Sequence, residues 1–142
     1  MTLVKPINKY IDYIDAPEDT FEQYVEKALK YDFRCVFANL QEYETGRAML
    51  EGSDIILAGA IDFPQGTMTL EEKLARFEEY AACGFTEIDY VLNQESVENR
   101  DFDAIEHEMA AVADFCRARG ITDKVIVEMC KLDGDDAAKR RV

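Results

Sequence analysis

The sequence lacks long apolar runs and closely spaced cysteines. No stretch approaches the roughly 20 apolar residues of a membrane-spanning helix, and the segment from Met1 to Tyr10 lacks the apolar core of a signal peptide. The 4 cysteines form no Cys-x-x-Cys pair, and most fall in apolar or amphipathic segments. We therefore expect a cytoplasmic protein whose cysteines are reduced core thiols rather than metal ligands or disulfides.

Positive charge and histidine are also scarce. Lys and Arg number 16 against 30 Asp and Glu, which gives a formal net charge of -14. Such a surface repels nucleic acid phosphates and anionic lipid, so small molecules or proteins are the expected partners. The only histidine, His107, lies roughly opposite the apolar positions Ile105 and Met109 of a predicted helix. We expect it to face solvent and to take no part in catalysis.

What the sequence does contain is a regular alternation of short apolar runs and longer segments with helical period. No repeat, low-complexity tract or Pro/Gly/Ser linker interrupts the 142 residues, so a single domain spanning residues 1–142 is expected. Near-continuous apolar strands suit a parallel sheet with helices on its faces, which places the fold in the α/β class. The predicted strands are Tyr10–Ile14, Cys35–Ala38, Ile55–Ile61, Glu87–Leu92 and Lys124–Cys130.

Helix ends are marked by capping residues. Thr69 and Glu72 form a capping box, in which each side chain accepts a hydrogen bond from the other residue's backbone N–H, and Gly84 ends that helix. Gly66 is expected to let the loop between the strand Ile55–Ile61 and the helix that begins at Thr69 turn tightly. The other predicted helices begin near Asp19, Glu42, Asp101 and Asp133.

Two architectures fit this order of elements. Five parallel strands can form an open, doubly wound sheet such as a flavodoxin-like binding module, or part of a (βα)8 barrel. The hydrophobic period does not distinguish the two. Local motifs therefore have to decide.

Four segments at strand ends, read in order from about Ile11 to about Asp136, resemble the deoxyribose-phosphate aldolase family. They are Tyr10-Ile11-Asp12-Tyr13, Ile61-Asp62-Phe63-Pro64-Gln65-Gly66, Glu87-Ile88-Asp89-Tyr90-Val91-Leu92-Asn93 and Lys124-Val125-Ile126-Val127-Glu128.

The resemblance implies a TIM-type (βα)8 barrel, of which this chain supplies about the first five βα steps, as a partial barrel. It implies a lyase that reversibly cleaves 2-deoxyribose 5-phosphate to glyceraldehyde 3-phosphate and acetaldehyde through a lysine Schiff base. No cofactor and no metal are implied. The expected partners are a small phosphorylated sugar or aldehyde substrate and further copies of the chain.

The resemblance also assigns roles to individual residues. Asp89 is cast as the proton-shuttling acid/base and Lys124 as the lysine beside it, while Asp12, Phe37 and Glu128 are expected to line the substrate pocket. From the residues alone, Asp89 lies inside an apolar strand, where desolvation favours its neutral form unless a cation or hydrogen bonds offset the cost. A purely structural carboxylate paired with a neighbouring lysine is the alternative.

The sequence departs from the family pattern in three places. Ile14 stands where the family has a hydroxyl residue, and the bulky Phe37 stands where it commonly has a cysteine. The Schiff-base lysine implied by the resemblance would lie beyond residue 142, and Lys131 is not expected to replace it. Three readings stay open: an aldolase, a truncated and inactive aldolase-like partial barrel that acts through oligomerisation, and a flavodoxin-like module.

Overall fold

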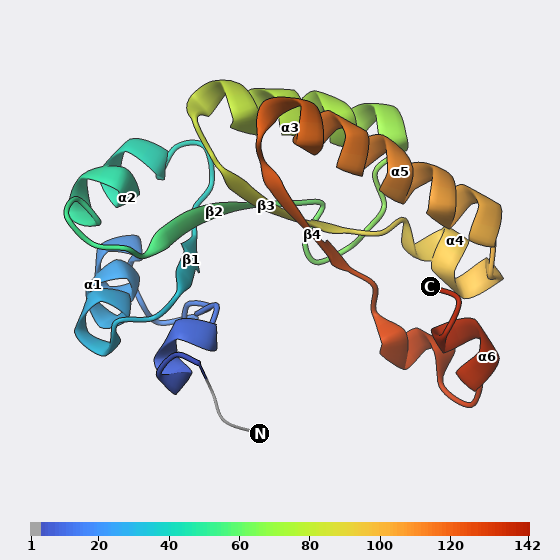
Figure 1. Ribbon diagram of the computed structural model, residues 1–142, viewed down its shortest axis with the longest axis horizontal. Coiled ribbons are helices and arrows are strands. Elements are labelled where there is room, and N and C mark those ends of the chain that lie inside the picture. The colour runs from blue at the N-terminus through green and yellow to red at the C-terminus, as the bar shows by residue number, and fades with distance from the viewer. Residues whose placement is uncertain (1–3) are drawn as a thin grey trace. The chain divides into compact units, whose positions relative to one another are not determined.

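The computed structural model describes residues 4–142, in which helices alternate with strands (Figure 1). The chain divides into two compact units, Met1–Gly59 and Ala60–Val142, and we describe each by itself. The single domain expected from the sequence stays a prediction. Among the described residues, no helix is both long and apolar enough to span a membrane.

The first unit contains one strand pair with its helices. β1 runs parallel to the start of β2, with Cys35 opposite Ile56 and Phe37 opposite Ala58. The core of this unit consists of Tyr24, Val25, Ala28, Val36, Leu50 and Ile55. Its elements are η1 (Ile7–Tyr10), α1 (Phe21–Tyr31), β1 (Cys35–Phe37), α2 (Tyr43–Met49) and β2 (Ile56–Ile61), whose last residues enter the second unit.

The prediction of a strand over Tyr10–Ile14 is wrong. The 3-10 helix η1 ends at Tyr10, and residues 11–14 contribute only a single parallel bridge between Asp12 and Cys35. The N–H of Tyr13 donates to the Cys35 carbonyl at 2.9 Å, but the Tyr13 carbonyl accepts the Tyr24 hydroxyl at 2.5 Å. Because a side chain takes the carbonyl that the next rung would need, the ladder stops after one bridge.

In the second unit a parallel strand pair is covered by helices. β3 and β4 pair from Glu87 opposite Thr122 to Val91 opposite Ile126. α3 and α5 lie side by side (Figure 1), and α5 contacts β4. The elements are α3 (Leu70–Cys83), β3 (Glu87–Val91), α4 (Gln94–Asn99), α5 (Phe102–Arg119), β4 (Thr122–Ile126), η2 (Met129–Leu132) and α6 (Asp136–Lys139).

The strand order is that of a partial barrel and not of a flavodoxin-like sheet. β1 and β2 are parallel, β3 and β4 are parallel, and the order is β1-β2-β3-β4. A flavodoxin-like sheet would place the segment around Asp12 between β1 and β2. Here β1 pairs directly with β2, while Asp12 bridges to Cys35 of β1. The alternation of parallel strands with helices agrees with the predicted α/β class.

The expected helix caps are confirmed in two helices and wrong in a third. Thr69 and Glu72 form the capping box of α3, and Gly84 ends it with φ 116°. α5 is capped by Asp101 and ends at Gly120. The first helix, however, is capped by Thr20 with Gln23, because Asp19 forms an ion pair with Lys27 at 2.6 Å.

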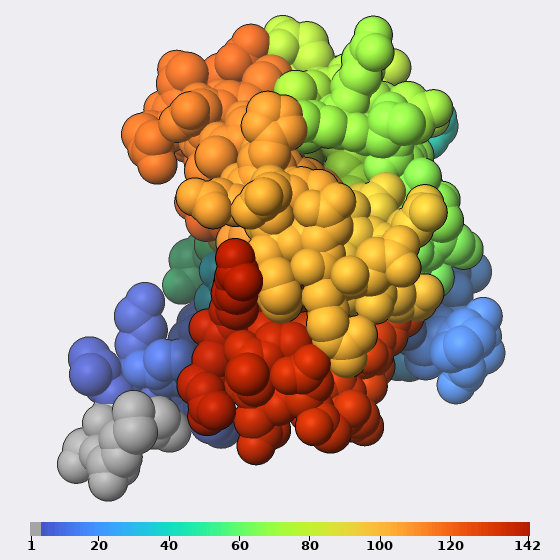
Figure 2. Space-filling view, turned by 90° about the vertical axis from the view of Figure 1, so that its right-hand side faces the viewer, coloured from blue at the N-terminus to red at the C-terminus, as the bar shows by residue number. Residues whose placement is uncertain are grey.

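Two boundaries and one helix in the second unit also differ from expectation. The last strand ends at Ile126 rather than Cys130, since Glu128 has φ 53°, a left-handed conformation that breaks an extended strand. The helix expected from Asp133 onward is only the four residues of α6, preceded by η2. Figure 2 shows residues 129–142 in red against α4, which η2 contacts. α4 itself, capped by the Asn93 side chain, was missed.

The cysteines are free thiols, as expected, but not all belong to the core. Cys35 and Cys116 are buried, Cys83 is half-buried and Cys130 is exposed. The early end of the last strand explains Cys130, because the residue falls in η2 instead of a covered strand. Burial raises the pKa of the Cys116 thiol to about 11.

Thiol reactivity should follow this burial. At pH 8 we expect Cys130 to react first with an aromatic disulfide reagent, and Cys116 to react only on unfolding, because it is covered and almost entirely protonated at that pH. Absorbance of the released thiolate measures the rates. The variant Cys130→Ser should lose the fast phase, and a fast phase that persists in it would contradict the assignment.

Gly66 serves the tight turn that the sequence predicted. Its φ is +66°, its N–H donates to the Asp62 carbonyl at 2.9 Å, and its own carbonyl accepts the Gln94 N–H at 2.8 Å. A Cβ at this position would collide with the Leu92 carbonyl oxygen and lie 2.8 Å from Val91 Cγ1. Glycine is therefore required both by the backbone angle and by the close approach of the loop after β3.

Gly66→Ala should lower the free energy of unfolding by more than ~2 kcal/mol, since a left-handed backbone and a backbone collision act together. Gly120→Ala is the matched control, because Gly120 has φ +68° with nothing within 4 Å of the added Cβ. It should cost only about 1 kcal/mol. Urea unfolding measures both, and equal losses would show that the close approach contributes nothing.

Candidate active site on strands β3 and β4

The two faces of β3 have different environments. Ile88 and Tyr90 are buried on the helix side, where the Tyr90 ring meets Phe77 of α3 edge-on at 5.7 Å. Because side chains alternate along a strand, Glu87 and Asp89 point to the opposite face. In a (βα)8 barrel the face away from the helices is the interior, so the strand directs two carboxylates there.

Lys124 lies directly beside these carboxylates. The parallel register of β3 and β4 sets Asp89 opposite Lys124. The Lys124 ammonium is 3.0 Å from Asp89 Oδ1 and 2.9 Å from Glu87 Oε1. The Asp89 side chain is only 14% exposed and that of Glu87 6%. A single cation thus offsets the cost of removing two carboxylates from water.

This arrangement can hold and transfer a proton. A largely buried carboxylate held beside an ammonium is the kind of group that serves as a general acid or base. The expected pairing of Asp89 with Lys124 is present. Glu87, the third member, was missed by the sequence reasoning, although it lies two residues before Asp89 and so on the same face.

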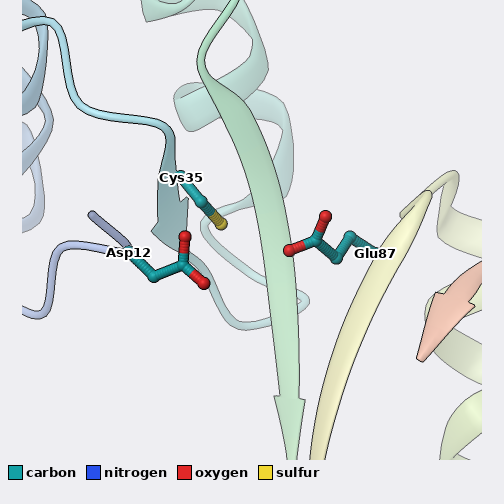
Figure 3. A group of neighbouring side chains, drawn as sticks. All are labelled: Asp12, Cys35 and Glu87. Carbon is teal, nitrogen blue, oxygen red and sulfur yellow. The ribbon is translucent and has the colours of Figure 1, made fainter. Parts of the chain in front are cut away.

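Asp12 and Phe37 belong to the first unit. Asp12 binds Arg34 through both oxygens, with Arg34 Nε 2.5 Å from Oδ1 and Nη2 2.7 Å from Oδ2. Figure 3 shows Asp12 on the segment that bridges to Cys35 at the start of β1. The backbone N–H of Phe37 donates to the Tyr24 hydroxyl at 2.8 Å. Their role in a substrate pocket shared with Asp89 stays a prediction.

Glu128 and His107 lie outside strands. Glu128 follows β4 in the left-handed conformation, with the Cys130 thiol 3.5 Å from its Oε2. Its place in the substrate pocket also stays a prediction. His107 is exposed on α5, as expected, and so are Glu71, Glu72, Glu78 and Glu79 on α3.

A second charged cluster was not anticipated. Lys73 of α3 is fully buried and lies 2.5 Å from Glu108 of α5 and 3.3 Å from Asp62, which follows β2. The signal available in the sequence was the position of Lys73, three residues after Leu70 and four before Phe77, on the stripe that faces the core. A lysine at a core position requires buried acidic partners.

The similarity to known proteins is extensive over this chain. It is 33% identical over 127 residues to the deoxyribose-phosphate aldolase of Lactobacillus acidophilus, covering 89% of this chain and 54% of that protein. It is 33% identical over 134 residues to that of Brevibacillus brevis, covering 92% and 60%. The Clostridium perfringens enzyme is 31% identical over 137 residues, covering 96% and 61%. No protein-family model matches the chain.

The solved structures agree. The deoxyribose phosphate aldolase of Aeropyrum pernix, described as a tetramer, superposes with a TM-score of 0.68 at 26% identity, over 89% of this chain and 56% of that one. The aldolase QR15 superposes with a TM-score of 0.70 at 22% identity, over 87% and 56%. The chain is therefore similar to deoxyribose-phosphate aldolases over most of its own length, and it spans about half to three fifths of the length of the curated relatives that it matches.

Proposed function

We propose that this chain supplies the proton-transfer side of a class I aldolase that reversibly cleaves 2-deoxyribose 5-phosphate to glyceraldehyde 3-phosphate and acetaldehyde. The observation that carries the proposal is the 3.0 Å contact between Asp89 and Lys124, in register on adjacent strands. The family resemblance cast Asp89 as the proton-shuttling acid/base and Lys124 as the lysine beside it. The relatives named deoxyribose-phosphate aldolase support the choice of reaction.

The chemistry requires an amine nucleophile and groups that move protons. The amine adds to the substrate carbonyl, and the carbinolamine loses water when an acid protonates its hydroxyl. In the cleavage direction a base then accepts the proton of the substrate hydroxyl as the carbon–carbon bond breaks and an enamine forms. Asp89 can exchange these protons, while Lys124 orients its carboxylate.

The nucleophile of this proposal is a lysine outside residues 1–142. Within residues 4–142, the lysines that form ion pairs are Lys9, Lys27, Lys73, Lys124, Lys131 and Lys139. Lys73 is fully buried, and Lys131 pairs with Glu98 at 3.3 Å, away from β3 and β4. Lys124 already holds two carboxylates.

The remaining expectations belong to the same proposal. Asp12, Phe37 and Glu128 would line the substrate pocket, with Phe37 narrowing it. The protein would bind a phosphorylated sugar or aldehyde, associate with further copies of itself, and work in the cytoplasm. The tetramer described for the Aeropyrum pernix enzyme supports self-association.

Borohydride trapping tests where the nucleophile lies. With acetaldehyde and borohydride, the 142-residue chain should give no stoichiometric adduct at any of its lysines, because within residues 4–142 the lysine beside Asp89 is Lys124, which is paired with two carboxylates. A longer product of the same reading frame should be trapped at a lysine outside these residues. Peptide mass mapping locates the adduct, and modification of Lys124 or Lys131 would contradict the assignment.

Asp89→Asn tests the acid/base role in the active protein. The amide keeps the shape but cannot carry the proton, so turnover of 2-deoxyribose 5-phosphate should fall about a hundredfold or more. Asp123→Asn is the matched control, because Asp123 lies on β4 next to Lys124 and so points to the other face of the strand. Full turnover by a folded Asp89→Asn variant would show that this carboxylate is only structural.

A further inference from the structure

The second unit contains a buried ionic network that the proton-transfer chemistry does not use. The side chain of Lys73 is 0% exposed, and those of its partners Asp62 and Glu108 are 3% and 8% exposed. Removing one partner from such a cluster leaves an uncompensated buried charge, so the three side chains act as a unit. This network of three side chains holds two loops in place.

On one side the network holds the loop after β2. Asp62 has φ 58°, and its two carboxylate oxygens accept the N–H groups of Thr67 and Met68, each at 2.9 Å. Its backbone carbonyl also accepts the N–H of Gly66 at 2.9 Å. Lys73 thus positions the Asp62 carboxylate, and the hydrogen bonds of Asp62 fix the backbone of the loop between β2 and α3.

On the other side the network holds the loop after β3. The second oxygen of Glu108 accepts the backbone N–H of Asn93 at 3.1 Å. Asn93 in turn caps α4 and donates from its side chain to the Met68 carbonyl at 3.4 Å. The N–H of Gln94 reaches the Gly66 carbonyl at 2.8 Å. The two loops are therefore fastened to each other and to Lys73.

The end of β3 that is held in this way carries the proposed acid/base. Leu92, just before Asn93, donates to the Ile126 carbonyl at 3.0 Å and so closes the register of β3 with β4. That same register sets Asp89 opposite Lys124. Only three residues separate Asn93 from Asp89, so a shift of the Asn93 backbone would also shift the Asp89 carboxylate.

We propose that Lys73 is a positioning residue for catalysis: through Asp62 and Glu108 it fixes the loops after β2 and β3, and with them the alignment of Asp89 and Lys124. This inference rests on the proposed aldolase function. Sites built at the carboxyl ends of barrel strands depend on their loops for geometry, and small misplacements of a reacting group slow the reaction strongly.

Two variants separate positioning from folding. Lys73→Met removes the ammonium but keeps most of the apolar stem. The triple variant Asp62→Asn, Lys73→Met, Glu108→Gln removes all three charges, so it stays folded if the lysine variant does not. Its amide oxygens can still accept the Asn93 N–H and one of the two N–H groups that Asp62 holds. Lys27→Met is the matched control, because Lys27 is 43% exposed and its ion pair with Asp19 lies in the first unit, outside this network.

Amide hydrogen exchange reports on the loops without reference to activity. In either Lys73 variant the N–H groups of Thr67, Met68 and Asn93 should exchange about tenfold faster relative to that of Phe77 in α3, whereas Lys27→Met should leave the ratio unchanged. Unchanged ratios in both Lys73 variants would overturn the proposal.

Turnover is then divided by the number of sites that borohydride traps. Because only folded protein forms the trapped adduct, this ratio reports on catalysis by folded molecules. In the active protein it should fall about tenfold or more in the Lys73 variants, with KM altered by less than about threefold. A network that only stabilises the fold would leave turnover per trapped site unchanged, and that result would overturn the inference. Failure of the aldolase function itself looks different, because the unchanged protein would then give neither adduct nor turnover.

Discussion

A charge that leaves water has to be paired, and this constraint governs the polar clusters of the second unit. Each cluster is built around one lysine: Lys124 between Glu87 and Asp89 on the strands, and Lys73 between Asp62 and Glu108 beneath the helices. In both, one ammonium serves two carboxylates that are nearly covered. Hydrogen bonds from backbone N–H groups supply further stabilisation for Asp62 and Glu108.

The two clusters differ in what surrounds them. Lys73 is completely buried, and its partners Asp62 and Glu108 accept hydrogen bonds from the backbone of two loops. This arrangement suits a structural role. Lys124 is 29% exposed, and its partners lie on the strand face opposite the helices. Because proton transfer requires access to a substrate, only the second arrangement suits direct chemistry. The geometry thus separates a group that can react from a group that keeps the reacting strands aligned.

In the first unit a neutral hydrogen-bonded side chain, that of Tyr24, joins two segments of backbone. The Tyr24 hydroxyl donates to the Tyr13 carbonyl and accepts the Phe37 N–H, so one residue of α1 joins the segment after Asp12 to the end of β1. Burial raises the pKa of this hydroxyl well above its usual range, which keeps it a donor at all physiological pH values. The same contact ends the strand ladder at a single bridge.

The sequence by itself determined the local features of this protein: the apolar strands with parallel character, the capping box at Thr69 and the turn at Gly66, because each depends on a few neighbouring residues. It also carried the family resemblance and, through Asp89 and Lys124, the centre of the candidate site. Only the tertiary structure decided the rest. The first strand is reduced to a bridge by Tyr24, and Lys73 is drawn into the core by Asp62 and Glu108, which lie 11 residues before it and 35 after it. Such contacts join positions that are distant in the chain, so no local sequence pattern predicts them.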